Sequence, residues 1–174
     1  MSVRYHNFGG VIGWNLQKYF PMLSSDSYLK LQRSTRNKLQ KEYIDYFLST
    51  GEPPMPLVVN LETINRCNST CSFCTANKNA EKRPYKRMED SLFYSIIDQL
   101  AEWGYAGHLT LYGNNEPFLD TRIVAFHKYC REKLPHSFIF LSSNGLLLTV
   151  DKVKEIIPYV NQLIINNYCR DMKL

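Results

Sequence analysis

Apolar and polar residues alternate along this chain in two different rhythms. Over the first fifty-odd residues, apolar side chains recur partly at helical spacing among Lys and Arg, which predicts helix until the stretch 51–54 (Gly-Glu-Pro-Pro) breaks it. Residues 57–61 then form a short β-branched apolar run that fits a buried strand. An apolar stripe over 91–103 predicts a helix that Asp90 could cap and Gly104 ends.

The same alternation of strand and helix repeats downstream. We expect strands over 108–112, 138–141 and 160–165 and helices over 121–134 and 151–157. Strands alternating with helices of this length imply right-handed crossovers and a parallel sheet, either open or part of a barrel. The predicted fold class is therefore α/β.

Each predicted strand is followed by a polar motif. Residues 67–74 follow the first strand, 113–117 the second, 142–145 the third and 166–168 the fourth. Because ligands of parallel α/β folds bind outside the carboxyl ends of the strands, we expect these motifs to converge on one site.

Composition indicates a globular protein and gives no sign of secretion. The chain has 174 residues and a net charge of +5, with no apolar run approaching the roughly twenty residues that span a bilayer. The polar start does not resemble a signal peptide, so we expect a cytoplasmic protein without membrane contact. A basic run over 78–87 could contact nucleic acid or an anionic cofactor, but a solvated loop is the commoner explanation, and nucleic-acid binding is not favoured.

The cysteines point to metal binding. Five cysteines, three of them within eight positions, argue against a disulfide framework. Cys67, Cys71 and Cys74 form a CxxxCxxC motif, and three thiolates bound to a four-iron four-sulfur cluster leave one iron open for another ligand. Zinc with a histidine as fourth ligand stays an alternative, although no second CxxC-like pair exists. We expect Cys130, His108, His127 and His136 to be structural.

This motif resembles that of the radical S-adenosylmethionine (SAM) superfamily, in which an aromatic residue precedes the last cysteine, as Phe73 does here. The resemblance implies that Cys67, Cys71 and Cys74 ligate three irons of a 4Fe-4S cluster. It further implies that the SAM amino and carboxylate groups chelate the fourth iron and that Phe73 lies near the adenine.

Further motifs match in order. The family's GGEP-like motif, which receives the SAM amino group, corresponds to 113–117, where Asn114 and Asn115 replace glycines and Glu116 keeps the carboxylate. Ser143 and Asn144 resemble part of a TNG stretch of the SPASM-associated group. Asn166, with Asn167, stands where the family often binds the SAM ribose and carboxylate.

The resemblance implies an incomplete (βα) barrel of the radical SAM type over 56–174, preceded by a helical extension over 1–55. It implies reductive cleavage of SAM to a 5'-deoxyadenosyl radical, with no acid-base triad, an electron donor such as flavodoxin or ferredoxin, and an unknown peptide or small-molecule substrate. Because a closed barrel takes roughly 250 residues, a truncated, catalytically idle fragment stays a second alternative. Cys169 is not expected to be a ligand.

Overall fold

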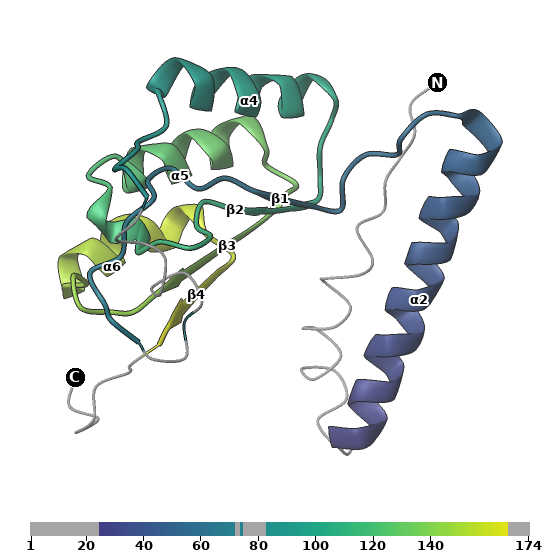
Figure 1. Cartoon of the computed structure of the whole chain (residues 1–174), viewed down its shortest axis with the longest axis horizontal. Coiled ribbons are helices and arrows are strands. Elements are labelled where there is room, and N and C mark those ends of the chain that lie inside the picture. Colours follow the sequence, from purple (N-terminus) through teal and green to yellow (C-terminus); the bar gives the residue numbers. More distant parts are fainter. Residues whose placement is uncertain (1–24, 72–73, 75–82, 167–174) are drawn as a thin grey trace. The chain divides into compact units, whose positions relative to one another are not determined.

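The computed structural model describes residues 25–71, 74 and 83–166 (Figure 1). The chain divides into two compact units, Met1–Leu57 and Val58–Leu174.

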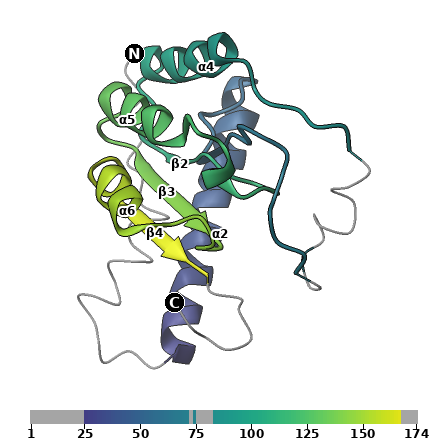
Figure 2. The ribbon, with the colours of Figure 1, turned by 90° about the vertical axis from the view of Figure 1, so that its left-hand side faces the viewer.

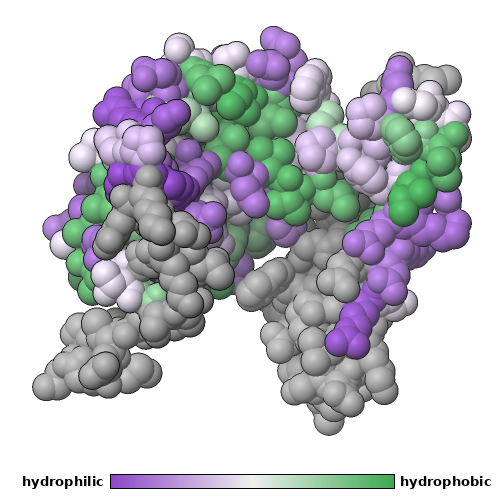
Figure 3. Space-filling model, viewed as in Figure 1, coloured by the Kyte–Doolittle hydropathy of each residue, from purple (hydrophilic) through white to green (hydrophobic). Residues whose placement is uncertain are grey.

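In the described part of the first unit, a long helix, α2 (Ser25–Thr50), ends at Gly51 as predicted. It carries an exposed ion pair between Lys41 and Asp45 at 2.7 Å. Exposed apolar side chains gather toward its C-terminal end, where Phe47 and Leu48 lie (Figure 3). None of the helices in the described ranges combines the length and the apolar character that crossing a bilayer requires.

The second unit is built on a four-stranded sheet in the order β1-β2-β3-β4, and every neighbouring pair is parallel. This order follows the sequence, so each crossover joins adjacent strands, and the helices α4, α5 and α6 lie together on one side of the sheet (Figures 1 and 2). The α/β prediction is confirmed. The strands are β1 (Val58–Asn60), β2 (His108–Thr110), β3 (Phe138–Ser143) and β4 (Gln162–Ile165).

The helices cover the sheet with an apolar core. Phe93 of α4 stacks on Phe126 of α5 with ring centroids 3.8 Å apart, and both side chains are buried. Beneath them lie Ile139 and Leu141, alternate residues of β3 that point to the helical side. The helical elements are α4 (Asp90–Glu102), η1 (Pro117–Leu119), α5 (Ile123–Lys133), α6 (Val150–Ile156) and η2 (Ile157–Tyr159).

Several local predictions were wrong. The second and fourth strands are shorter than expected, since β2 ends at Thr110 and β4 begins at Gln162. Asp90 does not cap α4: Glu89 is the N-cap residue, no side chain caps this helix, and the Asp90 carboxylate bonds to arginine side chains instead. The third strand extends to Ser143 rather than ending at residue 141, because β4 pairs with it as far as Ile165. Ser143 therefore belongs to the strand and not to the loop that follows it.

Candidate functional site

The carboxyl ends of the four strands bring the predicted motifs to one edge of the sheet. Just after β1, the Leu61 N–H donates to the Thr110 carbonyl of β2 at 2.9 Å. Just after β4, the Asn166 N–H donates to the Ser143 carbonyl of β3 at 2.8 Å, and its side-chain amide donates to Ser142 Oγ at 2.8 Å. The segments that leave the strands therefore start side by side.

The segment that carries the cysteines leaves the sheet after β1 and leads into α4, and residues 63–66 and 83–88 close its two ends into a neck. Asn65 joins its two sides three times: its N–H donates to the Lys86 carbonyl at 3.1 Å, its Oδ1 accepts from the Lys86 N–H at 2.8 Å, and its Nδ2 donates to the Pro84 carbonyl at 2.8 Å. The neck holds both ends of the cysteine loop in place without any contribution from the thiols.

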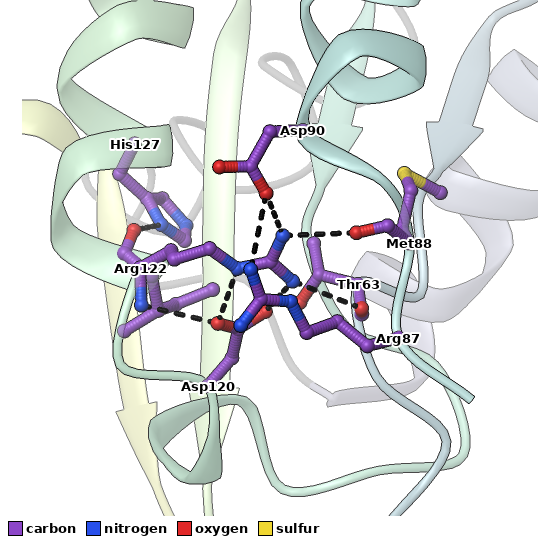
Figure 4. A network of polar contacts seen from close by, with 8 residues as sticks. Thr63, Arg87, Met88, Asp90, Asp120, Arg122 and His127 are labelled. Carbon is purple, nitrogen blue, oxygen red and sulfur yellow. Dashed lines mark hydrogen bonds and ion pairs between the residues drawn. The ribbon is translucent and has the colours of Figure 1, made fainter. Parts of the chain in front are cut away.

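Arg122, at the start of α5, secures this neck from the helical side (Figure 4). Its guanidinium donates to the Met88 carbonyl at 2.9 Å and reaches the Thr63 carbonyl at 3.5 Å, one carbonyl from each side of the neck. The same group bonds the Asp120 carboxylate at 2.7 Å and also contacts Asp90. The planar fork of arginine suits such a junction because it donates in several fixed directions.

Asp120 and Arg122 form a largely buried ion pair, with Asp120 only 3% exposed. Burial by itself would raise the pKa of Asp120, but the hydrogen bonds and positive charge of Arg122 lower it below its usual value overall. Hydrogen bonding to Asp120 likewise raises the pKa of Arg122. Both groups therefore stay charged, and the neck depends on their pairing.

Cys67, Cys71 and Cys74 are free, half-buried thiols. The Cys74 N–H donates to the Cys71 carbonyl at 3.1 Å, so these two cysteines lie across one turn. Within the described ranges, no three His, Cys, Asp or Glu side chains stand close enough together to hold a metal ion, so the three thiols are not gathered in this conformation. Phe73 lies outside the described residues. The donor set, three thiols on one loop, nevertheless matches an iron-sulfur cluster with one open iron.

Asn144, in the loop after β3, reaches across to the start of the cysteine loop. Its Nδ2 lies 2.8 Å from Asn68 Oδ1, 3.2 Å from Ser69 Oγ and 3.8 Å from Cys67 Sγ. The third strand and the cysteine loop are thus joined by one side chain.

Glu116 is buried, at 2% exposure, and its carboxylate is engaged within the protein. Oε1 accepts from the Ser143 hydroxyl at 2.8 Å and from the Phe118 N–H at 3.1 Å, while Oε2 accepts from the Asn144 N–H at 2.8 Å. A carboxylate has about four acceptor positions, of which three are used here. Direct contact with the SAM amino group would require exchange of these bonds or use of the remaining position.

Asn115 offers a donor that lacks a partner. Its Oδ1 accepts from the Gly113 N–H at 2.8 Å, which fixes the orientation of the amide, and its buried Nδ2 finds no partner among the described residues. Asn114 is exposed, and its N–H donates to Glu62 Oε1 at 2.9 Å. A buried N–H without an acceptor is costly, which fits a ligand that supplies one at this edge.

The residues expected to be structural occupy the core or the surface. Cys130 is fully buried in α5, and burial raises the pKa of its thiol. His127 is also fully buried; its Nδ1 lies 2.7 Å from the Ile123 carbonyl, and burial lowers its pKa to about 4. Burial lowers the pKa of His108 too, and His136 is exposed. Cys169 and Asn167 lie outside the described residues.

A family model described as the radical SAM superfamily matches residues 61–166, which is more than half of the chain. The chain belongs to the radical SAM superfamily. Membership implies a four-iron four-sulfur cluster and SAM as cofactors, and it places this chain in a family of enzymes that act on their substrates with a reductant.

One curated relative and two solved structures are similar to this radical SAM chain. The S-adenosyl-L-methionine-dependent 2-deoxy-scyllo-inosamine dehydrogenase of Niallia circulans is 24% identical over 97 residues, which are 56% of this chain and 38% of the dehydrogenase. The crystal structure of BtrN in complex with AdoMet and 2-DOIA matches with a TM-score of 0.58 at 20% identity, over 64% of this chain and 46% of BtrN. Selenomethionine BtrN in an open conformation matches with a TM-score of 0.60 at 20% identity, over 69% of this chain and 54% of BtrN.

The likeness to BtrN shows that the four-stranded sheet has the partial (βα) architecture of radical SAM proteins, as predicted. The chain spans 38% of the length of the dehydrogenase and about half of BtrN.

Sequence reasoning missed three residues that shape this radical SAM site. Asn65 and Arg122 hold the neck, and Glu62 accepts from the Asn114 backbone. Asn65 lies two positions before Cys67, so its closeness to the motif was a usable signal. For Arg122, fifty-odd positions from the cysteines, the sequence offers no local signal.

Proposed function

We propose that this chain binds a 4Fe-4S cluster through Cys67, Cys71 and Cys74 and uses it to cleave SAM reductively. The observation that carries the proposal is the set of three free, half-buried thiols on one loop, held at its neck against the carboxyl end of a parallel sheet. When bound, a reduced cluster would supply one electron to the sulfonium of SAM, which would release methionine and a 5'-deoxyadenosyl radical able to remove a hydrogen atom from substrate. The protein supplies thiolates, orientation and exclusion of water.

Cluster binding in this proposal reorganises the loop between fixed ends. The three thiols do not yet form a metal site among the described residues, whereas the neck is already bonded. Because metal binding is coupled to folding, the energy of forming three iron-sulfur bonds can gather the thiols. The neck limits the conformational entropy that this closure loses, since both ends of the loop are already held.

For SAM, we propose contacts along the same edge by Phe73, Asn114, Asn115, Glu116, Ser143, Asn144 and Asn166. The partnerless Nδ2 of Asn115 supports a hydrogen-bond acceptor of SAM, such as its carboxylate, at this position. The internal bond between Glu116 and Ser143 supports a role for this pair in orienting the site in addition to contacting SAM.

Other parts of the proposal concern the whole protein. We propose residues 1–55 as an extension to a radical SAM core over 56–174, a relationship to the SPASM-associated group through the stretch at 142–145, and a cytoplasmic location. Flavodoxin or ferredoxin would donate the electron. Between a peptide and a small molecule as substrate, the dehydrogenase relative favours testing a small molecule first.

Anaerobic reconstitution with iron and sulfide tests the proposal. We expect about four irons per chain and a brown protein, and, with SAM and dithionite, release of 5'-deoxyadenosine. Cys67→Ser, Cys71→Ser and Cys74→Ser should each lose cluster and cleavage. Cys130→Ser is the matched control, because that thiol lies in the core of α5 and should leave the iron content unchanged.

The same preparation separates the alternatives. A colourless protein that binds one zinc and no sulfide would replace the proposal by a zinc-binding module. A protein that holds the cluster but releases no 5'-deoxyadenosine would be the catalytically idle fragment, because cleavage needs an enclosed and oriented sulfonium.

A further inference from the structure

Asn144 occupies a junction between three segments of the site: the end of β3, the loop after β2 and the start of the cysteine loop. We infer that Asn144 is a positioning residue for the cluster, which holds the Cys67 end of the loop and supplies an amide hydrogen to the Cys67 sulfur. This inference rests on the proposed function, since it concerns the cluster that Cys67 would ligate.

The orientation of the Asn144 side chain is fixed by its own loop. Its Oδ1 accepts from the Leu146 N–H at 2.9 Å, which assigns the oxygen and leaves Nδ2 facing the cysteine loop. Its backbone N–H donates to the buried Glu116 carboxylate at 2.8 Å, which anchors the residue to the neighbouring strand end. The amide nitrogen is thus held from two directions before any cofactor binds.

The Asn144 amide has two N–H bonds for three acceptors on the facing loop. The contacts to Asn68 and Ser69, at 2.8 and 3.2 Å, hold the first residues of the loop, and the one to Cys67 Sγ is longer, at 3.8 Å. A thiolate accepts hydrogen bonds more strongly than a neutral thiol, so ligation of iron by Cys67 strengthens this contact.

A donor to a cluster ligand has two measurable consequences. Hydrogen bonds to the sulfurs help set the reduction potential, because they stabilise the extra negative charge of the reduced cluster. A group that orients a ligand also strengthens metal binding, typically by about ten- to a hundredfold in affinity, and weaker binding favours faster loss of the metal. Loss of the Asn144 donor should therefore lower the potential and speed the loss of iron.

Asn144→Asp and Asn144→Ala test the inference in complementary ways. Asn144→Asp keeps the acceptor for Leu146 but replaces the donor by an oxygen, and Asn144→Ala removes the donor without adding charge. Asn161→Asp is the matched control: its Oδ1 also accepts a backbone N–H, from Ile139 at 2.8 Å, but it lies before β4 at the opposite edge of the sheet. Circular dichroism of each variant checks that it folds.

After anaerobic reconstitution, iron content, the rate of iron loss to a chelator and the midpoint potential from an EPR-monitored titration are measured. We expect both Asn144 variants to lose iron about tenfold faster than wild type and to be harder to reduce, with Asn161→Asp unchanged. Should Asn144→Ala keep the wild-type potential and iron-loss rate, or Asn161→Asp shift as far as Asn144→Asp, the inference is overturned. A wild-type protein that binds no iron would overturn the proposed function instead, which keeps the two failures distinct.

Discussion

Ser143 Oγ donates to Glu116 Oε1 at 2.8 Å, and this buried contact fastens the end of β3 to the loop that follows β2. The second oxygen of the same carboxylate accepts from the Asn144 N–H, so one side chain organises two of the motifs. The sequence pattern predicts that Glu116 receives the SAM amino group, and in the structure the carboxylate accepts from three donors of the protein itself.

Replacement of Glu116 by Gln tests the hydrogen bonds that join its carboxylate to Ser143 and Asn144. The amide keeps the size of the side chain and one acceptor, but it places an NH₂ group opposite a backbone or hydroxyl donor. We expect the free energy of unfolding to fall by about 1–3 kcal/mol, the cost of a buried group left unsatisfied, as measured by urea denaturation. Glu102→Gln, at the exposed end of α4, is the control and should unfold like wild type; equal stability of both variants would contradict the role of Glu116.

Arg122→Met tests the support of the neck. It leaves the Asp120 carboxylate buried without its main partner and the Met88 carbonyl without its donor. We expect a loss of about 3–5 kcal/mol in unfolding free energy, as for a buried ion pair that loses one member. Arg122→Lys, which keeps the charge but not the fork, should lie between this variant and wild type.

A second substitution separates charge from packing. In the Arg122→Met background, Asp120→Asn removes the unpaired buried charge, so it should recover part of the lost stability. If the double variant is no more stable than Arg122→Met, packing of the arginine stem rather than the buried charge accounts for the effect.

The strand and helix elements were predictable because each carries its pattern within a dozen residues. The apolar run at 57–61 predicted the bounds of β1, and the helical pattern of apolar residues over 91–103 predicted those of α4, each to within a few positions. The parallel arrangement of the strands then followed from the alternation of strands and helices, because short right-handed crossovers allow few other topologies. The last residues of β3 were missed because Ser142 and Ser143 resemble a turn, and only pairing with β4 extends the strand.

The site was predictable as a set of motifs but not as a set of contacts. The convergence of residues after β1, β2 and β3 follows from strand direction, which the sequence indicates. Which groups then bond one another depends on side chains brought together from distant positions, such as Glu116 with Ser143 or Arg122 with Thr63. No local pattern records such pairs.

His127 should make stability depend on pH in mildly acidic solution. Burial lowers its pKa to about 4, whereas the unfolded chain has a value of about 6.5. Between these values the unfolded state binds more protons, so the free energy of unfolding should fall as the pH drops from about 6.5 to about 4, by up to about 3 kcal/mol. Urea denaturation at several pH values measures this slope.

His127→Leu should flatten that slope, because a buried apolar residue takes up no proton in either state. His136→Gln, at an exposed position, is the control and should keep the slope of wild type. If the unfolding free energy of His127→Leu depends on pH as steeply as that of wild type, groups other than His127 cause the dependence.

Thiol labelling of the cluster-free protein should divide the described cysteines into two classes. Cys130 has no exposed surface, and burial raises the pKa of its thiol. An alkylating reagent therefore cannot reach the sulfur, and the sulfur stays in the unreactive protonated form. Cys67, Cys71 and Cys74 are half-buried on one loop and free. A short pulse of iodoacetamide should modify these three thiols and leave Cys130 unmodified until urea unfolds the chain, as read by peptide mass spectrometry.

Reconstitution with iron and sulfide before the pulse should protect the three loop thiols together, because a shared cluster engages all of them at once. Protection of only one or two would contradict a common cluster, and early labelling of Cys130 would contradict its place in the core.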